Sequence, residues 1–256
     1  MKFGCTTDLL SPLNDDLGSV IHHAAELGVS GLALSLTPRS PFTVNSFSIG
    51  NLPFMKEARH HHVKIQSLYG LEILGAEPEA EMDYLKQAVL LSHALGSELV
   101  SLKLGFRKGA KPLGVAKEIV EETVDFAEDL DICIGIEPAL ETDLDSVAAT
   151  LDFIDSFKHQ HIGLVYNTAL HRFGDEKLPA NAAEIIKSYL LMVIIDQDAA
   201  GDFMSAHQAL LLLHKAGFED YVVLSGREGL ALDKEKIQKF KDYLNELKRE
   251  ERFISC

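Results

Sequence analysis

The ends of the apolar runs in this chain recur at a nearly constant interval. The runs close, in order, at Ser35, Tyr69, Lys103, Glu137, Asn167, Ile195 and Ser225. The successive steps between these positions are 34, 34, 34, 30, 28 and 30 residues. One strand, one helix and their two loops take roughly 30 residues. The interval therefore predicts a chain of repeated strand–helix units.

Eight such units fit within the 256 residues. Candidate strands are residues 2–6, 31–36, 63–69, 98–104, 132–137, 162–167, 190–196 and 221–225, with amphipathic helix patterns between them. Strands that alternate with helices form a parallel sheet, and eight units close into a (β/α)8 barrel of typically about 250 residues. The competing open, doubly wound sheet usually has a glycine-rich turn after its first strand, but residues 5–15 contain no glycine. We therefore expect an α/β protein with a single TIM-barrel domain over residues 1–256.

Helix-end signals agree with these boundaries. Asn14 and Asp15 are candidate N-caps for the helix pattern after the first strand, because short polar side chains accept bonds from the free N–H groups of a first turn. Gly28, Gly96 and Gly217 stand where helix patterns end, and glycine is the usual residue for the left-handed conformation found there.

The alternation within the strands predicts which side chains face the barrel interior. In residues 132–137 the isoleucines alternate with Cys133, Gly135 and Glu137, and the small residues suit a crowded interior. Lys103 alternates with aliphatic residues in the same way. Active sites of such barrels lie at the carboxyl ends of the strands. The expected rim residues are Thr7, Ser35, Tyr69, Lys103, Glu137, Asn167, Asp196, Asp198, Ser225 and Arg227.

The charge balance restricts the kinds of partner. The chain has 24 Lys and Arg against 39 Asp and Glu, a formal net charge of −15, which repels nucleic-acid phosphates and anionic lipid. No apolar run approaches the roughly 20 residues that span a bilayer, and the start lacks the pattern of a signal peptide. Three scattered cysteines offer no disulfide framework, which favours the reducing cytoplasm. We expect a cytoplasmic protein whose partner is a small molecule, with no nucleic acid and no membrane.

Four stretches of the sequence resemble one barrel family. They are AAELGVSGLALSL, MDYLKQAVLLSHALGSELVSLKLG, IGIEP and HQALLLLHKAGFEDYVVLS. They look like the xylose-isomerase-like barrels, which include sugar phosphate isomerases and epimerases and, as a distant branch, endonuclease IV. The resemblance implies a xylose-isomerase-like TIM barrel that acts on a sugar or a sugar phosphate. It also implies a divalent metal, held by a glutamate on strand five, an aspartate on strand six, a histidine on strand seven and a glutamate on strand eight.

The metal-ligand positions of that family are altered in this chain. They fall, in order, on Glu137, Asn167, Ile195 and Ser225. Only Glu137 keeps the family residue, and the histidine that usually follows the aspartate is Leu170 here, with His171 one place later. A hard cation needs several anionic oxygens, so we expect no tightly bound cofactor. The alternative is a weaker site for Mn²⁺, Mg²⁺ or Zn²⁺ formed by Glu137 with Asp196 and Asp198.

Two rim residues are candidates for catalysis. Glu137 could move a proton next to a carbonyl, and Lys103 could stabilise the resulting enediolate, bind a phosphate or form a Schiff base. In a purely structural alternative, Lys103 only neutralises Glu137 across the barrel mouth. The candidate substrate-binding residues are Tyr69, Asn167, His171, Arg227 and Ser225. His171 could equally be solvated surface, and Arg227 could equally pair with Glu228.

Two functions from different classes remain open. The first is a sugar or sugar phosphate isomerase or epimerase, which the carboxylate of Glu137 favours. The second is a non-catalytic sugar-binding barrel, which the neutral residues Asn167, Ile195 and Ser225 favour. The endonuclease branch ranks third, because it would need many more His and carboxylate ligands and a basic groove.

Overall fold

The chain folds as a closed barrel of eight strands that follow one another in chain order. The computed structural model describes residues 1–10, 16–37, 40–50, 52–105, 113–168, 182–197, 210–211, 213–226 and 234–254. The strands are β1 Lys2–Thr6, β2 Gly31–Ser35, β3 Lys64–Ile73, β4 Leu99–Leu104, β5 Cys133–Glu137, β6 Ile162–Asn167, β7 Leu190–Gln197 and β8 Tyr221–Gly226. All neighbouring strands are parallel, and β8 closes the ring against β1. The expected (β/α)8 barrel is confirmed; its extent as one domain over 1–256 stays a prediction.

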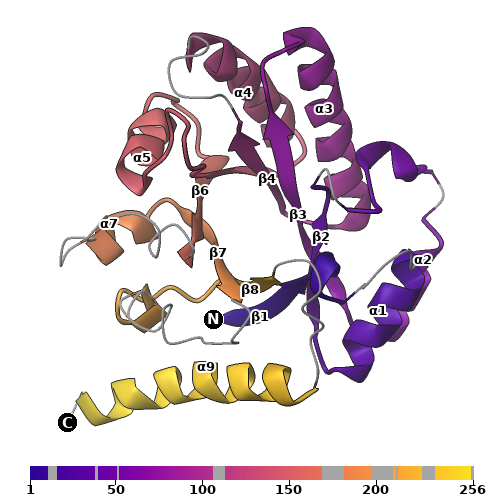
Figure 1. The fold of residues 1–256 in the computed structure, drawn as a ribbon, viewed down its shortest axis with the longest axis vertical. Coiled ribbons are helices and arrows are strands. Elements are labelled where there is room, and N and C mark those ends of the chain that lie inside the picture. The colour runs from indigo at the N-terminus through magenta and orange to yellow at the C-terminus, as the bar shows by residue number, and fades with distance from the viewer. Residues whose placement is uncertain are drawn as a thin grey trace.

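Helices surround the strands on the outside of the barrel (Figure 1). They are α1 Leu17–Glu26, α2 Phe54–His60, α3 Pro78–Leu95, α4 Leu113–Glu128, α5 Val147–Asp155, α7 Ala182–Lys187 and α9 Lys234–Ile254, and short 3-10 turns lie at Thr7–Leu9 and Val44–Ser46. Helix α9 packs against β1, where the rings of Phe240 and Phe3 lie 5.3 Å apart. Within the described residues, no helix combines the length and apolar content that a membrane crossing requires.

Strand β3 is longer than the sequence predicted. It was expected to end at Tyr69 but continues to Ile73, and its register against β4 shifts between Leu68 and Leu71. Gly70 allows this irregularity because its φ is +83° and an added Cβ would lie 2.4 Å from the methyl carbon of Thr37. Only glycine tolerates both the positive φ and the close approach. Tyr69 therefore lies before a bulge, not at a strand end.

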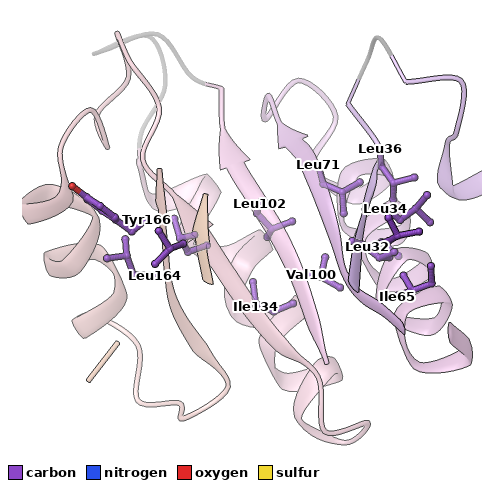
Figure 2. Close-up of a cluster of buried hydrophobic side chains, with 14 of the residues drawn as sticks. Leu32, Leu34, Leu36, Ile65, Leu71, Val100, Leu102, Ile134, Leu164 and Tyr166 are labelled. Atoms are coloured by element: carbon purple, nitrogen blue, oxygen red, sulfur yellow. The ribbon is translucent and has the colours of Figure 1, made fainter. Parts of the chain in front are cut away.

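The two faces of the strands form two hydrophobic clusters. The larger outer cluster fills the layer between strands and helices, and Figure 2 shows its side chains along successive strands. The smaller inner cluster lies inside the barrel and consists of Ala33, Tyr69, Leu99, Val165, Met192, Ile194 and Val223. The predicted alternation in β5 is confirmed: Ile134 and Ile136 belong to the outer cluster, and Cys133 packs against the inner one. Gly135 suits that interior, since an added Cβ would lie 2.5 Å from Val165.

One face assignment is wrong. Ile195 was expected at the metal-ligand position of strand seven, but its side chain belongs to the outer cluster, whereas Met192 and Ile194 belong to the inner one. Side chains alternate along a strand, so the next backbone position on the inner face after Ile194 is residue 196. The sequence does not reveal which of these residues faces inward, because both faces of a barrel strand are buried and both are apolar here.

The N-cap of the first helix lies one residue after the two predicted cap positions. Asp16 is the N-cap of α1, and its side chain accepts hydrogen bonds from the backbone N–H groups of Gly18 at 2.8 Å and Ser19 at 3.2 Å. Hydrogen bonds, chiefly from the Ser19 side chain, lower the pKa of Asp16. The candidates Asn14 and Asp15 lie outside the described residues.

The predicted helix-ending glycines are confirmed as left-handed positions. Gly28, Gly96 and Gly217 have φ values of 70°, 66° and 81°.

Candidate active site

Lys103 and Glu137 form an ion pair at the mouth of the barrel. They are in register on β4 and β5, and Lys103 Nζ lies 3.1 Å from Glu137 Oε1. The Glu137 side chain is only 1% exposed, whereas that of Lys103 is 33% exposed. The two residues predicted for catalysis are therefore adjacent, and the carboxylate is the more deeply buried of the two.

Asn167, at the end of β6, supports the same carboxylate. Its Nδ2 donates a hydrogen bond of 2.7 Å to Glu137 Oε1. Oε1 thus faces both the ammonium of Lys103 and the amide of Asn167, while the buried Oε2 of Glu137 has no hydrogen-bond partner among the described residues. A buried acceptor without a partner costs about 1–3 kcal/mol. Within the described part of the chain, one oxygen of Glu137 is therefore left without a hydrogen bond.

The environment of Lys103 favours its charged form. Burial lowers the pKa of Lys103, but Glu137 and Tyr69 outweigh burial and raise it above the ordinary lysine value. The ammonium lies 5.6 Å from the centre of the Tyr69 ring, within the range of a cation–π contact. A Schiff base requires the unprotonated amine. The structure therefore fits Lys103 as a fixed positive charge better than as a nucleophile.

A second set of hydrogen-bonded polar side chains lies at the carboxyl ends of β1 and β2. Ser35, which is fully buried, donates its Oγ proton to Asp8 Oδ2 at 2.5 Å, and its backbone N–H donates to Thr7 Oγ1 at 3.0 Å. Thr7 and Ser35 were predicted rim residues, but Asp8 was missed. The signal was present in the sequence, because Asp8 follows directly after the first predicted strand and Thr7.

The remaining predicted residues are described only in part. Ser225 is half-buried near the end of β8, and the backbone of Asp196 pairs with it in register. The side chain of Asp196 and the whole of Asp198, His171 and Arg227 lie outside the described residues. Their assignment to substrate or metal stays a prediction.

The described side chains around Glu137 do not fit a divalent metal site. In the part of the chain that the structure describes, no three His, Cys, Asp or Glu residues are grouped so that they could hold an ion. A metal would also have to compete with the ammonium of Lys103 and the amide N–H of Asn167, which both face Glu137 Oε1. Oxygen ligands with net negative charge are what such ions require. The cation already in place is a lysine.

The strand order and the polar strand-end residues define the class of protein as a (β/α)8 barrel with a candidate active site at its mouth. No family model and no curated protein matches the sequence. Among solved structures, the chain is similar to L-ribulose 3-epimerase, with 14% identity and a TM-score of 0.77 over 100% of this chain and 99% of that one. It is also similar to D-psicose 3-epimerase in the presence of D-fructose, with 15% identity and a TM-score of 0.74 over 99% of each chain.

A third similar structure is a xylose isomerase domain containing protein from Salmonella typhimurium. It has 14% identity and a TM-score of 0.74 over 96% of this chain and 97% of that one. The chain therefore has the xylose-isomerase-like barrel fold that the sequence resemblance implied. At these identities the likeness establishes the fold, and the reaction has to be argued from the site.

Proposed function

We propose that the protein is a sugar or sugar phosphate isomerase or epimerase that transfers a proton next to a carbonyl. One observation carries this proposal: Glu137 Oε2 is buried and has no hydrogen-bond partner among the described residues, while Oε1 of the same carboxylate is fixed by Lys103 and Asn167. A carboxylate held in this way is oriented before a ligand arrives, which is what proton transfer to a defined atom requires. The fold that the chain shares with sugar epimerases supports this proposed activity by analogy.

The proposed chemistry begins with proton removal by Glu137. Oε2 takes the proton from the carbon next to the substrate carbonyl, and the electrons of the broken C–H bond form the C=C bond of an enediolate. The carbonyl oxygen then gains negative charge, which the ammonium of Lys103 stabilises. A positional isomer forms when the former carbonyl carbon receives a proton and the neighbouring hydroxyl proton moves to the former carbonyl oxygen. A proton returned to the opposite face of the first carbon gives an epimer instead.

In this proposal Lys103 supplies the positive charge. In the xylose-isomerase-like barrels that the sequence resembles, a divalent ion supplies it. Lys103 is charged at neutral pH as an ordinary lysine is, and although burial lowers its pKa, Glu137 and Tyr69 raise it overall. A divalent ion bound by Glu137 together with Asp196 and Asp198 is the competing arrangement. We propose that no tightly bound metal is required.

The second candidate function is a non-catalytic sugar-binding barrel. Ser225 favours it, because this half-buried residue near the end of β8 carries no carboxylate. In that case Lys103 and Glu137 would only hydrogen-bond the hydroxyl groups of a sugar. Binding without any change of stereochemistry would distinguish this function from the first.

The test is product formation from a panel of ketoses, aldoses and their phosphates, followed by NMR. We expect a new stereoisomer or positional isomer with the wild type and a loss of about 100-fold or more in Glu137→Gln, the typical size of an acid–base contribution. Glu98→Gln is the matched control, since Glu98 also pairs with a lysine but is 67% exposed. Sugar binding without turnover in the wild type would establish the second function instead.

A further inference from the structure

Two histidines from different helices meet on the outside of the barrel. Helices α1 and α2 pack against each other there (Figure 1). His22 lies within α1, and His61 is the C-cap of α2, just before β3 begins at Lys64. The strands of a parallel barrel begin at the face opposite the mouth, so the histidine pair lies away from Lys103 and Glu137.

The separation of the two ring nitrogens suits a shared metal ion. His22 Nδ1 and His61 Nε2 are 3.3 Å apart, and the planes of the two rings are inclined at 69°. Zinc binds imidazole nitrogens at about 2.0–2.1 Å in tetrahedral geometry, which puts two such nitrogens about 3.3–3.4 Å apart. A hydrogen bond between the rings would fit the same distance, so the surroundings of each ring have to distinguish the two arrangements.

A carboxylate faces the other nitrogen of His22. Glu26 Oε1, one helical turn further along α1, lies 3.5 Å from His22 Nε2. A carboxylate at that nitrogen favours the tautomer with the proton on Nε2, which leaves the lone pair of Nδ1 on the side of His61. Histidines that bind a metal usually have this arrangement, in which the second ring nitrogen donates to a carboxylate or carbonyl. Glu26 therefore favours the form of His22 that binds a metal through Nδ1.

His61 is more enclosed than His22. Its side chain is 22% exposed, compared with 60% for His22, and its ring packs edge-on against the ring of His60, with centroids 4.9 Å apart. In the described ranges no group of three His, Cys, Asp or Glu residues could hold an ion, so an ion bound here would have two protein ligands and keep positions for water. Glu57 Oε2 lies 3.7 Å from the same Nε2 of His61, where it is placed to accept a hydrogen bond from such a water.

We propose that His22 and His61 form an exchangeable site for a divalent transition-metal ion such as Zn²⁺, which links α1 to α2. Imidazole nitrogens suit Zn²⁺, Cu²⁺ and Ni²⁺, whereas Mg²⁺, Ca²⁺ and Mn²⁺ prefer oxygen ligands. Two protein ligands hold an ion less tightly than the three or four of a resident zinc site. Occupation of this site does not depend on the proposed function, because neither histidine belongs to the barrel mouth.

Calorimetric titration with ZnCl2 tests the site, using the full chain after dialysis against EDTA and removal of the chelator. At about pH 7.5 imidazole is mostly unprotonated, as metal binding requires. The wild type should bind zinc, and His22→Ala and His61→Ala should each weaken this binding by at least about 10-fold, with a smaller factor for Glu26→Gln. His23→Ala is the matched control, because His23 also contacts Glu26, at 3.6 Å, but points about 100° away from His22 around α1.

Thermal unfolding distinguishes a metal ligand from a purely structural contact. An ion that binds the folded chain stabilises it, so zinc should raise the Tm of the wild type and of His23→Ala but not that of His22→Ala or His61→Ala. In EDTA the Tm differences among these proteins should largely disappear. The double variant His22→Ala/His61→Ala should lose no more zinc binding than either single variant, because one ion requires both rings.

Three outcomes would overturn the proposed site. Zinc binding that persists unchanged in His22→Ala and His61→Ala would do so, as would a wild type that binds no zinc. An equal loss of binding in His23→Ala would show an adventitious ion held by surface histidines in general. A Tm deficit of His22→Ala and His61→Ala that is the same in zinc and in EDTA would show that a hydrogen bond alone joins the rings.

Discussion

Among the described residues, two lysine–glutamate pairs link the ends of neighbouring strands, and the shorter one is the less consequential. Lys64 Nζ and Glu98 Oε1 are 2.7 Å apart near the amino ends of β3 and β4, with side chains 42% and 67% exposed. Lys103 and Glu137 are 3.1 Å apart at the carboxyl ends of β4 and β5, with Glu137 only 1% exposed. Water screens the first pair and is excluded from the glutamate of the second. Burial, and not distance, therefore determines what each pair does.

The surroundings shift the pKa values of the lysines in both pairs in the same direction. Burial lowers the pKa of Lys64, but the hydrogen bond to Glu98 and nearby charges raise it overall. Burial likewise lowers the pKa of Lys103, but Glu137 and Tyr69 raise it overall. The difference lies in the glutamates, because only Glu137 has lost its contact with water. A site for chemistry requires that loss, and a surface pair does not.

The largest expected effect is the loss of stability in Lys103→Met. This change leaves the buried carboxylate of Glu137 with the hydrogen bond from Asn167 but no opposite charge, and breaking a buried pair typically costs about 3–5 kcal/mol. Glu137→Gln should cost less, because the lysine left behind is a third exposed and can reach water. Urea denaturation of both variants measures the two free energies of unfolding.

The double variant Lys103→Met/Glu137→Gln provides the control for that prediction. It removes both charges, so its free energy of unfolding should exceed the value that the sum of the single losses implies, by about 0.5–3 kcal/mol. Strictly additive losses would show that the two side chains do not interact in solution.

A smaller effect should appear at alkaline pH. The folded-state pKa of Lys103 is raised above its ordinary value of 10.5, so the unfolded chain releases this proton first as pH rises. The stability that Lys103 contributes is therefore fully present below pH 10.5 and is lost as pH rises through the folded value. The free energy of unfolding of the wild type minus that of Lys103→Met should stay constant from about neutral pH to pH 10.5 and shrink above it. Lys86→Met, which removes a lysine paired with the exposed Glu122, controls for general loss of charge. A difference in free energy of unfolding that does not change with pH would contradict a raised pKa of Lys103.

The smallest effect should come from the exposed pair. Lys64→Met and Glu98→Gln should each change the free energy of unfolding by no more than about 1 kcal/mol, the range measured for solvent-exposed pairs, and raised salt should reduce the change further. Activity should be unchanged in Glu98→Gln. If Glu98→Gln were as destabilising as Lys103→Met, burial would not be what separates the two pairs.

Much of the barrel could be predicted from the sequence because its repeat is regular. The strands β1 and β6 have the predicted bounds, and the alternation in β5 assigned Glu137 to the interior. The errors arose where both faces of a strand are apolar or where the strand is irregular. In β7 every residue from Leu190 to Ile195 is hydrophobic, so hydrophobicity cannot reveal which side faces inward. In β3 the bulge at Gly70 shifts the register, and no simple alternation predicts such a shift.

The site was predictable in its residues but not in its contacts. Strand-end positions identified Lys103, Glu137 and Asn167 because a parallel barrel gathers such positions at one mouth. The sequence could not indicate that both partners approach Oε1 of Glu137, nor that no side chain in the described ranges bonds to Oε2. Nor could it indicate that Asp8, in the 3-10 turn directly after β1, accepts a hydrogen bond from a buried serine 27 residues away. Both facts depend on side-chain geometry after the barrel has closed.

The most direct measurement of the central claim is deuterium exchange by protein that has been dialysed against EDTA. The claim is that Glu137 moves the proton and that Lys103, not a divalent ion, supplies the positive charge. Using a sugar that the wild type turns over, the account predicts that the metal-free wild type still exchanges the proton next to the carbonyl with D2O. Lys103→Met should lose this exchange under the same conditions. Exchange that vanishes with EDTA and returns on addition of Mn²⁺ would contradict the claim.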